Sequence, residues 1–203
     1  MNKKKHFYLL YTLLFLGLAG LLVYFYYSQG KALIDYKGDG FRQHYRAVLY
    51  TSDLLKNIFS DIFVNHSFAI PQWDFSLGEG YDILQTFHYY GVSDPLISLS
   101  ALVPDRYVYL FYDFAALFRM YLSGLAFAGL CFYTGRKEVI SLLCGSLIYS
   151  FCGYPLVAAT GHTFFLSAMI WLPMIIKGVE KILNDDSPAY LSVSVCLSAL
   201  SNV

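Results

Sequence analysis

The sequence has few charged residues and no excess of either sign. Lys and Arg together number 14, as do Asp and Glu, so the formal net charge is zero. A neutral chain has no long-range attraction for nucleic acid, and we expect no nucleic-acid partner. Cysteine is also sparse: the four residues lie in apolar stretches, with no CxxC pair and no Cys/His spacing typical of zinc sites. We interpret them as small buried hydrophobic residues.

Apolar residues are abundant, at 57% of the chain, and the mean hydropathy is +0.50. A membrane span needs about 20 mostly apolar residues. The sequence therefore predicts an all-α polytopic membrane protein with spans at about 7–27, 107–133, 139–158 and 164–183. A fifth apolar stretch, 189–203, is too short to cross. We therefore expect residues 1–203 to be the N-terminal part of a longer membrane domain.

The basic residues predict the orientation of these spans. Lys3, Lys4 and Lys5 precede the first span, Arg136 follows the second, and Lys181 closes the fourth. Basic residues favour the cytoplasmic side, which places the N-terminus inside the cell and the loop 28–106 outside. The first apolar run is long for a signal peptide and has no small-residue cleavage site after it, so we expect it to be retained as a helix.

The long outer loop should have structure of its own. The apolar spacing over 41–64 indicates an amphipathic helix lying along the membrane surface. The run 96–103 indicates a second interfacial helix, for which Asp94 and Pro95 are a suitable N-cap and first residue. The segments 70–74 and 77–80 are expected to form turns and irregular backbone.

A candidate site lies at the start of the first loop helix. Asp39, Arg42, Gln43 and Arg46 are spaced i, i+3, i+4 and i+7, which would place them on one helix face. A carboxylate beside two guanidinium groups suits a phosphate and a hydroxyl that needs a base. Alternatively, Asp39 is a helix N-cap and the arginines contact lipid headgroups.

Other loop residues are weaker candidates. Asp35 and Asp39, with Glu79 or Asp82, have the carboxylate oxygens that a divalent metal prefers, although loop carboxylates are usually solvated. No cofactor is otherwise indicated.

Three further side chains have both a functional and a structural interpretation. His88 and His162 lie near the outer face, where a lone histidine is more often a hydrogen-bonded interfacial residue than a ligand. Trp73 suits stacking on a sugar ring, or equally an interfacial anchor.

Two charges lie within the second span. Asp113 and Arg119 are six residues apart, so they do not share a helix face and need partners elsewhere. They either bond to neighbouring helices or line a transport path.

The order of short motifs resembles the YfhO family of bacterial membrane proteins. The motifs are Asp-Tyr-x-Gly-Asp-Gly-x-x-Gln at 35–43, Pro71-x-Trp73, Gly78-x-Gly80, Tyr90, Asp94-Pro95-Leu96, Gly161-His162 and Trp171-Leu172-Pro173, after the lysine-led first helix. They cover nearly the whole chain in order.

The resemblance implies a GT-C-like glycosyltransferase in the bacterial cytoplasmic membrane. Such an enzyme takes sugar from a polyprenyl-phosphate donor, made by a partner enzyme, and decorates a surface polymer such as lipoteichoic acid. It implies Asp39 as the catalytic base, with Asp35 second. The candidate substrate-binding residues are Arg42, Gln43, Arg46, Trp73, His88, Asp94 and His162. The alternatives are a transporter or lipid flippase, and a non-catalytic scaffold.

Overall fold

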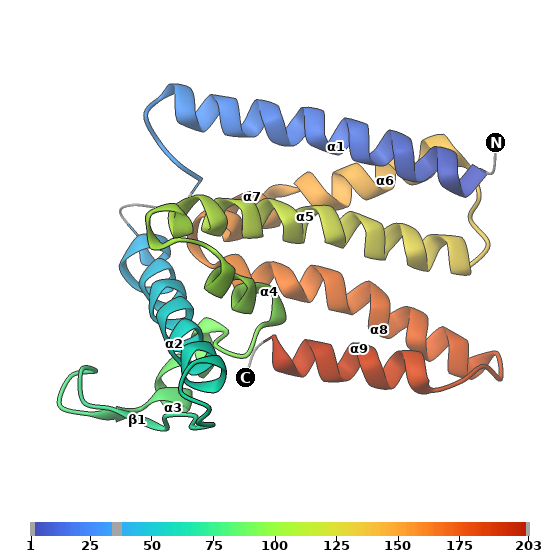
Figure 1. The fold of residues 1–203 in the computed structure, drawn as a ribbon. Helices are drawn as coiled ribbons and strands as arrows, with labels where there is room; N and C mark the ends of the chain where they lie inside the picture. The colour runs from blue at the N-terminus through green and yellow to red at the C-terminus, as the bar shows by residue number, and fades with distance from the viewer. Residues whose placement is uncertain (1–2, 34–37, 202–203) are drawn as a thin grey trace.

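The fold is a bundle of long helices with shorter elements gathered across one end (Figure 1). It is seen in a computed structural model that describes residues 3–33 and 38–201. Among these residues, four helical stretches are long and apolar enough to cross a membrane: Lys4–Ser28, Asp105–Tyr133, Val139–Val157 and Thr163–Leu183. These four candidate spans agree with the predicted all-α multi-pass membrane protein.

The bundle is built around α5 (Val108–Tyr133), which packs against α8 (Ser167–Leu183) and α6 (Val139–Phe151). Outside them lie α1 (Lys3–Ser28), against α6, and α9 (Ala189–Leu200), against α8. The closest approach is at Gly124, where a Cβ atom would lie 2.1 Å from the Tyr11 hydroxyl oxygen and 2.4 Å from Ser150 Oγ. Glycine is therefore required for the hydroxyls of α1 and α6 to meet at 3.0 Å.

The third span is interrupted, which the prediction of one helix over 139–158 missed. α6 ends at Phe151, Cys152 has an extended backbone, and α7 (Gly153–Gly161) continues the span. Proline has no N–H and its ring clashes with the carbonyl four residues earlier. For Pro155 that carbonyl belongs to Phe151, which explains why α6 stops there.

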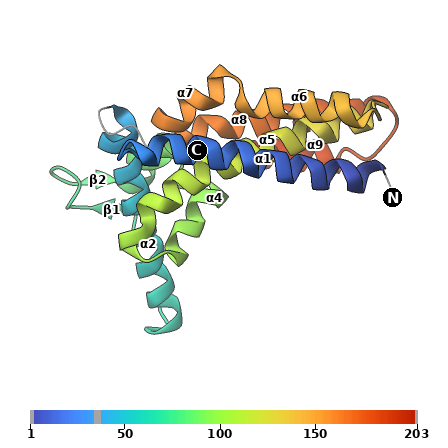
Figure 2. The same ribbon diagram turned by 90° about the horizontal axis from the view of Figure 1, so that it is seen from above.

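The loop segment 41–64 is helical up to Phe63, and its position on the membrane surface stays a prediction. A π-helical turn, η1 (Gly40–Tyr45), leads directly into α2 (Arg46–Phe63). α2 buries its small residues, Ala47, Val48, Thr51 and Ser52. In both ribbon views α2 runs across the direction of the bundle helices (Figures 1 and 2), as a helix lying along a membrane surface would.

The segments expected to be irregular contain a small antiparallel ladder. β1 (Trp73–Asp74) pairs with β2 (Tyr81–Asp82), with Trp73 opposite Asp82. The connecting turn contains Gly78 at φ +59° and Gly80 at φ +106°, conformations that side chains rarely adopt. The glycines that suggested irregular backbone instead form the turn of a hairpin.

The rest of the loop consists of short helical turns. They are α3 (Ile83–Phe87), α4 (Pro95–Ser98), and 3₁₀ turns at His88–Tyr90 (η2), Leu99–Leu102 (η3) and Asp105–Tyr107 (η4). The expected second interfacial helix over 96–103 is thus α4 followed by η3. A further 3₁₀ turn, η5 (Thr163–Leu166), precedes α8.

The three basic clusters used to predict orientation lie at the end of the bundle opposite to this loop, at the start of α1, in the α5–α6 connection and at the end of α8 (Figure 1). Lys4 Nζ lies 5.6 Å from the centre of the Phe132 ring, and Lys181 Nζ lies 5.6 Å from the centre of the Tyr133 ring. The α5–α6 connection at this end contains Arg136 and Lys137. The three clusters used to predict orientation therefore share one end.

Candidate functional site

Asp39 lies immediately before η1, at the end of the bundle that bears the loop. Its side chain is 51% exposed. Gln43 Nε2 donates a hydrogen bond of 2.9 Å to Asp39 Oδ1, and Tyr90 Oη donates one of 3.1 Å to Gln43 Oε1. His162 Nε2 lies 3.9 Å from Asp39 Oδ2. The fold thus joins three predicted site residues, Asp39, Gln43 and His162, from segments far apart in sequence.

Asp39 occupies the N-cap position of η1, but its side chain does not cap the helix. An N-cap residue normally has an extended backbone, and its side chain accepts an N–H from the first turn. Asp39 has helical angles, φ −67° and ψ −25°, and its carboxylate accepts no such bond. One carboxylate oxygen accepts a hydrogen bond from Gln43, the group is half-exposed, and its role as a base stays a prediction.

Arg42 and Arg46 are both exposed at the start of this helix. Over the described ranges 3–33 and 38–201, neither forms an ion pair with a carboxylate. Both guanidinium groups are thus accessible to an anionic ligand, and their binding of phosphate stays a prediction.

Asp35, the second candidate base, lies outside the described residues. Among the residues that the structure does describe, no group of three or more His, Cys, Asp or Glu side chains is arranged to hold a metal ion. Asp82 instead accepts the Gln85 N–H at 2.7 Å and caps α3. Because Asp35 is part of the suggested metal site, a divalent metal there stays a prediction.

Sequence reasoning missed His44, which lies beneath Asp39. Its side chain is 2% exposed, and neither ring nitrogen has a hydrogen-bond partner among the described residues. The rings of His44 and His162 are 4.6 Å apart, and Phe164 packs at 4.8 Å. Burial, and then the neighbouring His162, lower the pKa of His44 from 6.5 to about 4, against the opposing pull of Asp39. In the sequence His44 lies between Arg42 and Arg46, and no local pattern indicates that it is buried.

The lowered pKa of His44 predicts that acid lowers the stability of the folded protein. Above pH 6.5 His44 is neutral in both the folded and the unfolded chain, so its titration does not change the free energy of unfolding. As the pH falls towards 4, only the unfolded chain takes up the proton, so stability is lost. At pH 4.5 the loss from this group is about 2 to 3 kcal/mol. In detergent, the midpoint of thermal unfolding should fall less between pH 7.5 and 4.5 for His44→Phe than for wild type. An equal fall in both would contradict the prediction.

His88 and Trp73 lie apart from the Asp39 group. His88 Nδ1–H donates to the Gln85 carbonyl at 2.7 Å, the local bond expected of an interfacial histidine. Trp73 is 54% exposed on β1, and it lines a cavity of about 200 Å³ with Asp53, Asn57 and Asp74. No contact among the described residues joins either one to Asp39, and substrate contact stays a prediction for both.

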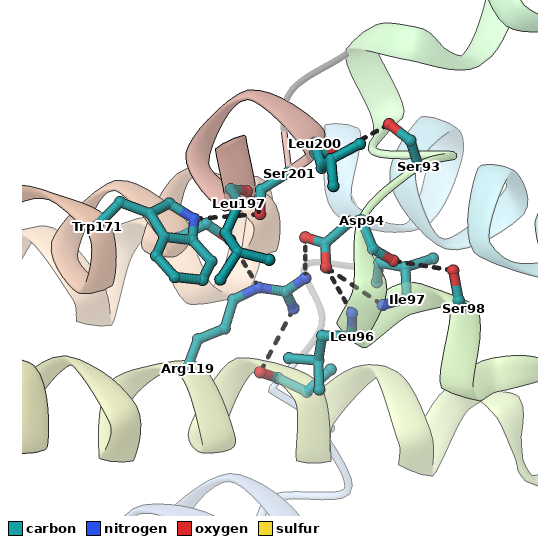
Figure 3. Close-up of polar contacts among 12 residues, drawn as sticks. Ser93, Asp94, Leu96, Ile97, Ser98, Arg119, Trp171, Leu197, Leu200 and Ser201 are labelled. Carbon is teal, nitrogen blue, oxygen red and sulfur yellow. Dashed lines mark hydrogen bonds and ion pairs between the residues drawn. The ribbon is translucent and has the colours of Figure 1, made fainter. Parts of the chain in front are cut away.

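Asp94 and Arg119 form a buried ion pair (Figure 3). Arg119 Nη2 donates to Asp94 Oδ2 at 2.7 Å, and Arg119 Nε donates to Ser167 Oγ at 3.1 Å. Asp94 Oδ1 accepts the N–H groups of Leu96 and Ile97, which confirms its predicted role as the cap of α4. Both side chains are almost fully buried: Arg119 is 1% exposed and Asp94 is 3% exposed.

A cavity of about 280 Å³ lies beside the pair. Asp94 and Arg119 are on its wall, and the remaining lining is mostly apolar, including Leu99, Leu122 and Trp171. The last turn of α9 is held beside it: Trp171 Nε1 donates to Ser201 Oγ at 3.1 Å, and Ser93 Oγ donates to the Leu200 carbonyl at 2.8 Å (Figure 3). The carboxylate of Asp94 already has three donors, so its contact with substrate stays a prediction.

The other intramembrane charge also has neighbours. Asp113 Oδ2 accepts hydrogen bonds of 3.0 Å from the Tyr27 hydroxyl and from the Leu33 N–H. The prediction that Asp113 and Arg119 bond to separate partners elsewhere is confirmed.

The comparisons agree with the membrane architecture. The chain matches no curated protein and no solved structure. Residues 12–202, nearly the whole chain, match the family described as bacterial membrane protein YfhO. Most of the apolar spans and the ordered motifs of the loop between α1 and α5 fall inside this match, and the chain belongs to the YfhO family of bacterial membrane proteins.

Proposed function

We propose that this protein is a glycosyltransferase of the bacterial cytoplasmic membrane with a GT-C-like architecture. Its donor is a polyprenyl-phosphate sugar made by a partner enzyme, and its acceptor is a surface polymer such as lipoteichoic acid. The observation that carries the proposal is the Asp39 carboxylate, which is exposed, oriented by Gln43, and placed at the start of a helix lying across the bundle end.

The chemistry needs a base and a site for the leaving group. In the proposed reaction, Asp39 accepts the proton of an acceptor hydroxyl as that oxygen attacks the anomeric carbon. The bond from this carbon to the lipid phosphate breaks, and the polyprenyl phosphate leaves with the bonding electrons. The exposed Arg42 and Arg46 are suited to its charge, because guanidinium groups bind phosphate through paired hydrogen bonds. The leaving group is the lipid phosphate, so the step needs no nucleotide.

The arrangement of charges supports an outer location for this chemistry. Lys4, Arg136 and Lys181 lie at the end of the bundle remote from Asp39. Basic residues favour the cytoplasmic side of a membrane. The N-terminus is then cytoplasmic, and Asp39 lies at the outer headgroup level, where a polyprenyl phosphate and a surface polymer meet.

The contacts of the intramembrane charges favour a transferase over a transporter. A transport path would need Asp113 or Arg119 to face an open route. Instead Asp113 accepts hydrogen bonds from Tyr27 and Leu33, and Arg119 is paired with Asp94 and bonded to Ser167. Both charges are thus engaged in holding the loop to the bundle.

The test compares cells that lack the protein with cells that express it in full from its gene. Two quantities are measured: sugar on the surface polymer, and lipid-linked sugar accessible to a reagent that does not cross the membrane. A transferase predicts that, without the protein, the polymer loses its sugar while lipid-linked sugar accumulates in the accessible pool. Accumulation in the inaccessible pool instead would reject the transferase in favour of a flippase, and an unchanged polymer would reject both.

A further inference from the structure

A third cavity lies at the end of the bundle that bears the α5–α6 connection, remote from Asp39. It lies between the end of α5 and the beginning of α6 and has a volume of about 500 Å³. Its lining divides into an apolar part on the bundle side and a polar rim from the α5–α6 connection and the first turn of α6. The apolar part includes Phe127, Leu142 and Gly145, and the rim includes Arg136, Lys137 and Ser141.

The rim is electropositive. Arg136 and Lys137 are exposed, and within 3–33 and 38–201 neither side chain forms an ion pair. Glu138 is the one acidic residue in the lining. α6 begins at Val139, so the free N–H groups of its first turn add partial positive charge to the same rim.

The apolar part extends from this rim into the bundle. A Cβ atom on Gly145 would lie 3.1 Å from the Phe127 ring, so the ring packs against bare backbone there. Leu142 is 4% exposed and joins the cavity to the core shared by α1, α5 and α6. A free inorganic anion would leave this apolar surface uncovered, whereas the acyl chains attached to a lipid phosphate could pack against it.

We propose that this cavity binds an anionic phospholipid, with the phosphate between Arg136 and Lys137 and an acyl chain along Phe127 and Leu142. Basic pockets between membrane helices are known to hold anionic headgroups. This site is separate from the glycosyltransferase proposal, because its residues lie at the other end of the bundle. The test of lipid binding is therefore independent of the reaction proposed at Asp39.

The experiment measures lipid binding to the purified full chain in detergent by native mass spectrometry. Phosphatidylglycerol is compared with phosphatidylcholine of the same chains, and soluble glycerol phosphate tests the headgroup alone. We expect selective retention of phosphatidylglycerol. In Arg136→Gln/Lys137→Gln its affinity should fall about 25-fold, since each cation near a membrane surface is worth roughly fivefold. The matched control is Lys31→Gln/Arg106→Gln, which removes two exposed cations at the other end and should bind like wild type.

A second variant tests the shape of the site. Ser141→Phe leaves the charge unchanged and places a ring in the cavity, and it should also weaken phosphatidylglycerol binding. Unaltered binding in both the glutamine double variant and Ser141→Phe would overturn the proposal. Binding of glycerol phosphate as tightly as phosphatidylglycerol would overturn it too, because the site would then recognise phosphate without a lipid.

Discussion

Asp39→Asn is expected to lower the rate of sugar transfer about 10²- to 10⁴-fold, the range that a positioned general base contributes. The amide has the shape of the carboxylate, and its oxygen can still accept the hydrogen bond from Gln43 Nε2. It cannot take up a proton at neutral pH. The measurement is sugar on the surface polymer in cells expressing the full-length protein, at matched levels in the membrane.

Asp61→Asn is the matched control for this prediction. Asp61 lies on the same helical segment, and its Oδ1 accepts a hydrogen bond of 2.8 Å from Asn65 Nδ2, also four residues later. The control removes the same charge from the same kind of local pair, so its transfer activity should equal that of wild type. Normal activity in Asp39→Asn would remove this residue from the mechanism and direct attention to Asp35.

Arg119→Met is expected to destabilise the protein by about 3 to 5 kcal/mol, because it leaves the Asp94 carboxylate buried without its partner. For a domain of this size, such a loss lowers the midpoint of thermal unfolding by roughly 6 to 20 °C. Asp94→Ser is the reciprocal change: serine still caps α4, but Arg119 loses its counterion. It should destabilise by a similar amount.

The double variant makes this test specific to the pair. Asp94→Ser/Arg119→Met has no unpaired charge, keeps a capping side chain, and replaces the guanidinium by an apolar group of similar length. Its unfolding midpoint in detergent should lie much closer to wild type than that of either single variant. If the two losses simply add in the double variant, the ion pair is not what holds α4 to the bundle.

The spans were predictable because hydropathy and length are local properties, and the basic clusters at one end agree with the predicted orientation. The break at Cys152 was predictable in principle. Pro155 has no N–H to donate to the Phe151 carbonyl, and its ring clashes with that carbonyl, so a regular helix cannot continue there. It was overlooked because apolarity runs through the break. The hairpin was missed because its strands are only two residues long, too short for an alternating pattern.

The site was predictable only where it is local. The Asp39–Gln43 contact is an i, i+4 pair, and its spacing predicted it. The approach of His162 to Asp39 joins residues 123 positions apart, which no periodicity can indicate. His44 was missed for the same reason, because its burial comes from His162 and Phe164 after α7 and η5 fold over η1. Arg119 was known to need a partner, but only the fold identifies it as Asp94.

The order of Asp94 and Arg119 along the chain bears on how the protein enters the membrane. An arginine near the middle of a membrane helix costs about 2.5 to 3.5 kcal/mol during insertion. Asp94 precedes Arg119 by 25 residues, and the hydrogen-bonding Ser167 follows 48 residues later. The counterion is therefore already synthesised when the second span leaves the ribosome. Arg119 can therefore pair with Asp94 before α8 is synthesised, and its neutralisation does not depend on Ser167.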